Sequence, residues 1–109
     1  MDVVGEFRTA AVRLHVLHHA AEGGMHGAWM TAELARHGHR IAPSTLYPLL
    51  HRMQPVGLLT SRTELVEGRH RGRYQATDHG RAVLAECRAA LGGLTAELIP
   101  PDQPVQDQC

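Results

Sequence analysis

Residues 41–59, IAPSTLYPLLHRMQPVGLL, constrain the fold more than any other part of the chain. Their apolar side chains recur at positions i, i+3, i+4 and i+7, which places them on one face of an α-helix. These side chains are Leu46, Leu49, Leu50 and Met53. Pro43 suits the first helical position, where its missing N–H would have no partner. Pro55 removes a helical hydrogen bond and should end or kink the helix by Gln54.

The opposite face of this helix carries short hydroxyls, an aromatic ring and cationic groups. The residues are Ser44, Thr45, Tyr47, His51 and Arg52. Such side chains suit phosphate oxygens and the edges of DNA bases. A helix that is apolar behind and polar in front, following a shorter helix, is what a helix-turn-helix requires. We predict that this face enters the major groove of DNA.

Two helices are expected before this stretch. Residues 6–22 carry an apolar face at helical spacing. That face consists of Phe7, Ala10, Ala11, Leu14, Leu17 and Ala21. Thr31 is expected to cap a short second helix over residues 32–37. Residues 25–29 should connect the two helices, with Trp29 packed in the core beside the first.

A strand–turn–strand pattern follows the third helix. Residues 58–65 and 73–76 are predicted to be strands, joined by a turn rich in glycine and arginine over residues 66–72. The tip of this hairpin is expected to carry Arg69, His70, Arg71 and Arg73. A cationic hairpin beside a recognition helix suits flanking phosphates or the minor groove. The alternative is a hairpin that is only solvated.

The last helix is predicted from its cap at Thr77, through Asp78, to about residue 98. Its apolar residues are spaced as in two heptads of a coiled coil. They are Leu84, Cys87, Leu91, Leu94 and Leu98. Two heptads are too few for an independent coiled coil, so we expect this seam to pack with the first helix of a partner chain. A seam buried inside its own protomer is the alternative.

The cysteines and the end of the chain give further expectations. Cys87 is expected to fill space in the seam as a small apolar residue, the alternative being a disulfide between two protomers. Cys109 lies in residues 100–109, PPDQPVQDQC, which are almost without apolar side chains and are predicted to be a disordered tail.

The distribution of charge along the chain favours a nucleic-acid partner, although the net charge does not show it. The formal net charge is zero, but seven arginines and two glutamates give residues 36–73 a charge of +5. A basic middle segment is an electrostatic footprint for DNA. Two cysteines do not make a secreted disulfide framework, and neither a signal peptide nor a membrane span is visible. We expect a cytoplasmic protein.

Residues 37–62, HGHRIAPSTLYPLLHRMQPVGLLTSR, and residues 72–84, GRYQATDHGRAVL, resemble the PadR family of winged-helix transcriptional regulators. The similarity extends over roughly residues 6–98. The resemblance implies a homodimer held by the terminal helices, and we expect this dimer to act as a repressor. Two recognition helices related by a dimer axis predict a pseudo-palindromic operator with half-sites about one helical turn apart. The resemblance also implies a second interpretation of Trp29, as a surface on which a flat ligand stacks at the dimer centre.

A histidine-rich turn of the first helix is the other candidate site. His15, His18, His19 and Glu22 lie along one edge of its apolar face. Imidazoles at i and i+4 with a carboxylate one turn on are able to hold Zn²⁺ or a similar divalent ion. Val16 occupies the position where a zinc protease carries its general base, so we predict no hydrolase and no enzyme. The alternative is that these histidines are structural or solvated.

The sequence thus predicts a mainly α fold with a small β-hairpin, a winged helix-turn-helix whose terminal helices form a dimer interface. Residues 1–77 would be the DNA-binding domain, residues 78–99 the dimerisation helix and residues 100–109 the tail. The predicted function is a repressor released by a small molecule or metal ion, with no cofactor required for binding DNA. A second hypothesis is a metal-binding sensor that acts mainly through metal rather than DNA.

Overall fold

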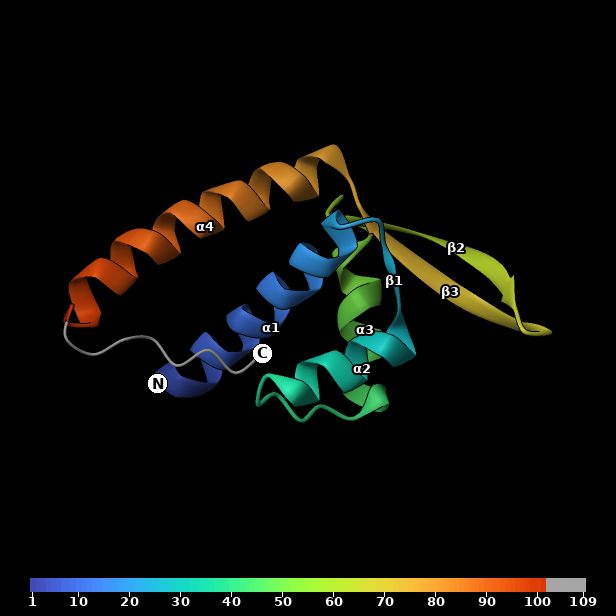
Figure 1. The fold of residues 1–109 in the computed structure, drawn as a ribbon, viewed down its shortest axis with the longest axis horizontal. Coiled ribbons are helices and arrows are strands. Elements are labelled where there is room, and N and C mark those ends of the chain that lie inside the picture. Colours follow the sequence, from blue (N-terminus) through green and yellow to red (C-terminus); the bar gives the residue numbers. More distant parts are fainter. Residues whose placement is uncertain (102–109) are drawn as a thin grey trace.

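The computed structural model describes residues 1–101, which form four helices and three strands. Their order is α1 (Val3–Ala21), β1 (Met25–His26), α2 (Gly27–Arg36), α3 (Pro43–Met53), β2 (Leu59–Val66), β3 (Arg69–Ala76) and α4 (Asp78–Leu98). The strands form one antiparallel sheet in the order β1-β3-β2. Figure 1 shows the β2–β3 hairpin at one end of the molecule and α4 extending past α1 toward the other. The predicted mainly α, winged helix-turn-helix class is confirmed.

Helix α3 forms as its sequence predicts. It begins at Pro43, and its C-cap is Gln54, directly before Pro55. Its four predicted inward residues are all buried. They pack into a single core with side chains of α1, α2, the sheet and the first turns of α4. Burying a large apolar side chain contributes roughly 1.5–3 kcal/mol, so these contacts determine how α3 is oriented on the domain.

Helix α1 differs from its prediction in extent and in its buried face. It begins at Val3 because the Asp2 side chain caps it, accepting a hydrogen bond from the Gly5 amide at 3.0 Å. The core takes the face formed by Val12, Val16, Leu17 and Ala20. Of the face predicted from spacing, only Leu17 is fully buried, and Phe7 is 58% exposed. The helix has two apolar faces, and the sequence pattern does not tell which one the core uses.

The segment before α3 is more ordered than predicted. Met25 and His26 are not a connector but a short strand that pairs with Tyr74 and Arg73 of β3. Helix α2 then begins at Gly27, so Thr31 lies inside the helix, where its hydroxyl donates to the Gly27 carbonyl at 3.2 Å. Trp29 is on the first turns of α2 and is 47% exposed, which corrects the prediction that it lies in the core.

The hairpin is longer and its turn tighter than predicted. Strands β2 and β3 pair from Leu59↔Ala76 to Val66↔Arg69, leaving only Glu67 and Gly68 in the turn. Both turn residues have positive φ, 50° and 76°, as a two-residue hairpin turn with the twist of the strands requires. Residues 69–72, predicted to belong to the turn, are therefore part of β3.

Helix α4 starts as predicted, and its first turns join the core. The Thr77 hydroxyl accepts a hydrogen bond from the Gly80 amide at 2.9 Å and donates to the Gly57 carbonyl. Gly80 has to be glycine because a Cβ there would lie 2.2 Å from the Leu58 carbonyl oxygen. Leu84 is buried in its own protomer, which corrects its prediction as a dimer contact.

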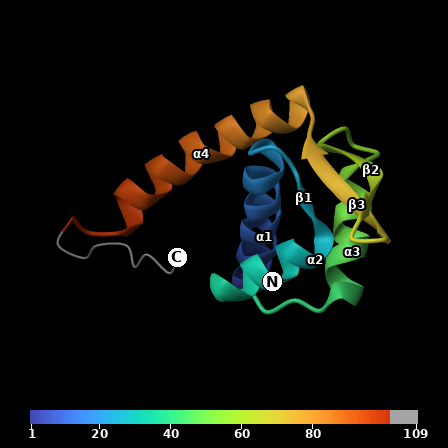
Figure 2. The same cartoon turned by 45° about the vertical axis from the view of Figure 1, so that its right-hand side comes forward.

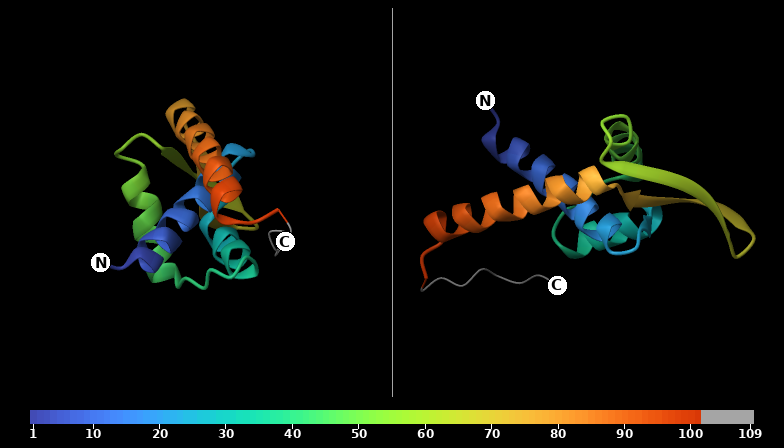
Figure 3. Two further views of the ribbon diagram at one scale, coloured as in Figure 1. Left: turned by 90° about the vertical axis from the view of Figure 1, so that its left-hand side faces the viewer. Right: turned by 90° about the horizontal axis from the view of Figure 1, so that it is seen from above.

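The rest of α4 leaves its apolar seam uncovered. Leu91, Leu94 and Leu98 are 42%, 44% and 67% exposed, and Cys87 is half-buried with a free thiol. In Figure 2 this part of the helix projects away from the domain, and Figure 3 shows α4 crossing α1. The start of α1 adds Val3, Val4 and Phe7, all exposed. Exposed apolar surface is typical of the sites at which proteins associate.

Within residues 1–101, none of the helices is long and apolar enough to cross a membrane. The predicted tail over residues 100–109 lies, from residue 102 onward, outside the described part of the chain, and Cys109 lies there with it.

Candidate nucleic-acid interface

The burial of one face of α3 determines what the other face presents. Ser44, Pro48 and His51 point away from the core, while Thr45 and Arg52 lie exposed along one edge and Tyr47 lies half-buried along the other. All five predicted contact residues are thus at the surface of the helix. Pro48, at the centre of the outer face, is a sixth candidate. Its position on the same helical face as Ser44 and His51 would have indicated this from the sequence.

The edge of α3 that carries Tyr47 is braced by α2 and the sheet. The Tyr47 ring lies so close to Gly27 that a Cβ at that position would come within 2.6 Å of it. His51 Nε2 is 3.5 Å from the hydroxyl of Tyr74, a buried residue of β3. Burial raises the pKa of Tyr74, and the neighbouring Tyr47 adds to the effect. The Tyr74 hydroxyl lies at the outer limit of hydrogen-bond distance from the imidazole of His51, so β3 contacts this edge of α3.

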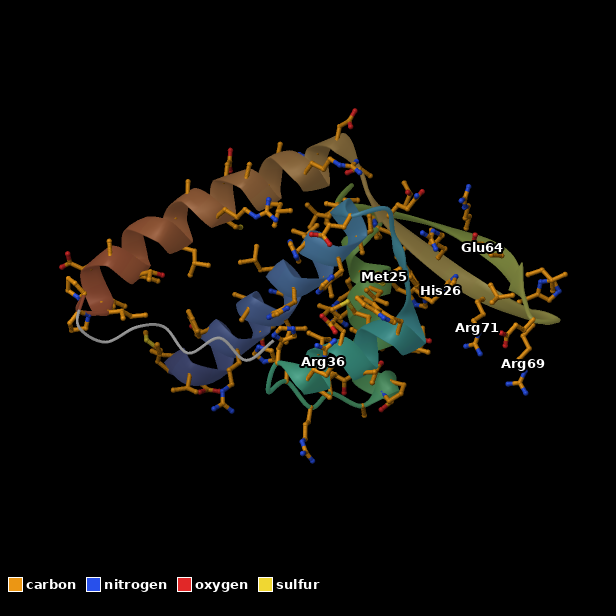
Figure 4. All side chains as sticks on the ribbon, viewed as in Figure 1. Met25, His26, Arg36, Glu64, Arg69 and Arg71 are labelled. Carbon is orange, nitrogen blue, oxygen red and sulfur yellow. The ribbon has the colours of Figure 1, made fainter. Side chains whose placement is uncertain are left out.

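The three hairpin arginines do not share one environment, which corrects their prediction as a group at the tip. Arg73 lies further from the turn, opposite Arg62 of β2 and His26 of β1, where it donates to the Gly23 carbonyl and lies 3.6 Å from the Glu64 carboxylate. Arg69 and Arg71 lie near the end of the hairpin and project from the same side of it (Figure 4). Neither has a carboxylate partner within residues 1–101, so their charge is available to a ligand.

Glu64 of β2 links the hairpin to β1. Its carboxylate lies 2.8 Å from His26 Nε2, 3.6 Å from Arg73 and 3.9 Å from Arg62. The hydrogen bond from His26 is the main cause of the lowered pKa of Glu64, and the two arginines lower it further against the effect of burial. Sequence reasoning did not find this contact because it depends on β1, a strand with no local signal.

The predicted metal ligands fall into two groups. Donor atoms of His18, His19 and Glu22 lie within 4.8 Å of one another, the spacing needed to share an ion. Within this group His18 Nε2 lies 3.2 Å from Glu22, and His18 Nδ1 lies 2.7 Å from the guanidinium of Arg88 on α4. His15 does not join this group.

The His15 ring lies instead among histidines of the segment between α2 and α3. Its centroid is 5.0 Å from that of His37 and 5.4 Å from that of His39, against 6.4 Å from that of His19. Burial lowers the pKa of His15, and the rings of His37 and His39 lower it further. A group of imidazoles packed so closely disfavours the protonated state.

Glu33 of α2 contacts α1 through His19. Its carboxylate is nearly buried and lies 2.8 Å from Arg36, 3.3 Å from His37 and 3.4 Å from His19. Burial alone would raise the pKa of Glu33, but the Arg36 guanidinium and the His37 hydrogen bond outweigh it, so the pKa is lowered. This contact between a carboxylate of α2 and a histidine of α1 has no signal in the sequence, because it depends on how the two helices pack.

The lowered pKa of His15 predicts a pH dependence of stability. The unfolded chain protonates His15 near the ordinary pKa of 6.5, whereas the folded chain protonates it only at a lower pH. Stability that is fully present above pH 6.5 is therefore lost as the pH falls through the lowered pKa of the folded state. We expect thermal unfolding with EDTA to show a lower Tm at about pH 5.5 than at about pH 7.5. His15→Gln should reduce that difference, whereas His70→Gln, at an exposed position of β3, should leave it unchanged. An equal loss in both variants would contradict the assignment.

Comparison with known proteins agrees with this geometry. Residues 16–86 match the model of the transcriptional regulator PadR-like family. Transcriptional regulator Rv3488 of Mycobacterium tuberculosis is 56% identical over 94 residues, 86% of this chain and 88% of that protein. A PadR family regulator from Eggerthella lenta is 34% identical, with a TM-score of 0.73 over 85% of this chain and 82% of the other.

A further solved structure is similar in fold and contains nucleic acid. Bacillus subtilis PadR in complex with operator DNA has a TM-score of 0.64 and 21% identity, over 89% of this chain and 53% of the other. The family match spans more than half of the chain, and the M. tuberculosis relative covers most of it. The protein is a member of the PadR-like family of transcriptional regulators.

Proposed function

We propose that this DNA-binding regulator is a homodimeric repressor that places α3 of each protomer in the major groove of a pseudo-palindromic operator. The observation that carries the proposal is the outer face of α3, with Ser44, Thr45, Tyr47, His51 and Arg52 at the surface and the free cations Arg69 and Arg71 beside it. The family to which the chain belongs is one of regulators and not a class of enzymes. Because its partner is chromosomal DNA, we place the protein in the cytoplasm.

The uncovered seam of α4 supports the dimer. Leu91, Leu94 and Leu98 together with Phe7 form apolar surface on the two terminal helices. Association costs roughly 4–15 kcal/mol, and three leucines at about 2 kcal/mol each when fully buried contribute at most roughly 6 kcal/mol per chain, near the low end of that cost. We therefore expect the start of α1 to join the interface. Two recognition helices related by a dimer axis read half-sites about one helical turn apart.

A divalent metal ion is our candidate inducer, and the donor atoms of His18, His19 and Glu22 support it. His19 also lies 3.4 Å from Glu33 of α2. We propose that the ion takes Nε2 of His19, the nitrogen of this contact, so that metal binding loosens α1 from the helix-turn-helix. The sequence hypothesis of a protein that acts mainly through metal has no support in the family match.

The DNA assignment predicts two different effects of substitution. Arg71→Ala should weaken binding to any duplex and reduce the salt slope of log K by about 1 per protomer, because a phosphate contact is lost. Tyr47→Phe keeps the ring on Gly27 and removes only the hydroxyl, so it should reduce discrimination between operator and random DNA, roughly fivefold for one hydrogen bond. Fluorescence anisotropy on the upstream region of the protein's own gene measures both. An unchanged salt slope in Arg71→Ala would rule out the hairpin assignment.

The dimer assignment is tested on two positions of α4. Leu94→Gln places a polar group in the exposed seam and should shift sedimentation velocity toward the monomer by at least tenfold in dissociation constant. Ala96→Gln makes a similar change at an exposed position on the opposite face and should leave the dimer intact. If both variants sediment as the wild type does, the seam is not the interface.

The inducer assignment predicts that Zn²⁺ or Cd²⁺ weakens operator binding at least about fivefold, the lower range of allosteric coupling. His19→Gln should still bind the operator and lose this response, while His70→Gln should keep it. Anisotropy with and without the ion provides the measurement. Metal-independent binding of the wild type would reject a metal inducer and leave the regulator standing.

A further inference from the structure

The arginines form two groups, those whose guanidinium contacts another group of the protein and those whose guanidinium makes no such contact in the described residues. The chain has eleven arginines and no lysine. Within residues 1–101, five of them contact a carboxylate, a carbonyl or a histidine. These are Arg36, Arg62, Arg73, Arg81 and Arg88. The other six make no such contact in the described part of the chain, and they are Arg8, Arg13, Arg40, Arg52, Arg69 and Arg71.

Three of the six free arginines meet in one groove. A hollow of about 370 Å³, open to solvent, lies between α1, the segment joining α2 to α3, and α3 itself. Arg8, Arg40 and Arg52 line it, one from each of these elements. We call this hollow the arginine groove. Arginines 69 and 71 lie on the hairpin, so five of the six free cations flank the recognition helix.

The arginine groove has the chemistry of an anion site. Its lining adds the hydroxyls of Thr9 and Thr45 to the three guanidinium groups, and no carboxylate lines it among the described residues. Unpaired like charges drawn together repel one another, and a bound anion relieves that repulsion. Guanidinium groups match phosphate oxygens with two parallel hydrogen bonds each. The floor comes from Val12 and Leu49 of the core, so the groove has a rigid base.

The arginine groove and the hairpin lie on opposite edges of α3. Tyr47, on one edge, lines a hollow with His70 and Arg71 of β3. Thr45 and Arg52, on the other edge, line the arginine groove. A DNA strand laid along the outer face of α3 would therefore meet free cations on both sides. Such contacts fix the position of a recognition helix on the duplex without reading sequence.

We propose that the arginine groove holds a phosphate of the DNA backbone, so that Arg8 and Arg40 are positioning contacts alongside Arg52. This inference rests on the proposed function and extends the interface to α1 and to the segment before α3. Arg8 lies one residue after Phe7, which we expect to contact the partner protomer. The position of the partner would therefore affect where Arg8 meets the phosphate.

The test compares salt slopes of DNA binding for matched arginine variants. Arg8→Ala and Arg40→Ala should each weaken binding to operator and random duplexes alike, and each should reduce the slope by up to about 1 per protomer between roughly 50 and 200 mM salt. Arg13→Ala is the matched control, because Arg13 is also an exposed, free arginine of α1 but lines a different hollow, with Asp2 and Glu6. Arg40→Lys keeps the charge and should retain most of the wild-type slope.

The outcomes separate this inference from the function on which it rests. Wild-type protein without salt-sensitive DNA binding would reject the proposed function itself. Wild-type binding with slopes in Arg8→Ala and Arg40→Ala equal to the wild type, or with Arg13→Ala reducing the slope as much, would overturn the arginine groove as a DNA contact. If inorganic phosphate then raised the Tm of the wild type but not of Arg40→Ala, the groove would belong to a free anion.

Discussion

The packing of four apolar side chains of α3 against the core is the constraint on which the rest of the structure depends. Leu46, Leu49, Leu50 and Met53 are buried among residues of α1, α2 and the sheet, so the helix has no freedom to rotate about its axis. Every functional feature follows from that one orientation. It turns Ser44 and His51 outward, brings Tyr47 onto Gly27, and opens the arginine groove along the other edge. A recognition surface on a short helix needs this rigid support, since a helix of about three turns is marginal by itself in water.

The sequence predicted those parts of the fold that depend on local periodicity and capping. The bounds and inward face of α3 and the start of α4 at its Thr77 cap all come from spacing and residue type within a few positions, and the structure agrees. The strand at Met25 and His26 has no such signal, because two residues carry no pattern and only pairing with β3 makes them a strand. The candidate site divides in the same way. The face of α3 was predictable, whereas Arg8 and Arg40 join it only through the packing of helices distant in sequence.

Charge shows why composition is a poor guide to this interface. A net charge of zero and a formal +5 over residues 36–73 describe the chain, but the structure decides which cations are available. Arg36, Arg62 and Arg73 are within the basic segment and are engaged by Glu33 or Glu64. Arg8 is outside that segment and faces the recognition helix. Glutamates thus neutralise the arginines that hold the domain together and leave free those that flank α3.

On the proposed function, regulation passes through helix α1. Its first turns carry apolar surface for a partner, Arg8 faces the arginine groove, and His18 and His19 lie near its end beside the Glu33 contact. A ligand shifts a regulator only by its difference in affinity for two arrangements of the protein. An ion held by residues of α1 alone would bind both arrangements equally. On the proposed function His19 supplies the difference, because an ion bound through Nε2, the nitrogen that contacts Glu33 of α2, and the DNA-competent packing of α1 on the helix-turn-helix would be mutually exclusive at that atom.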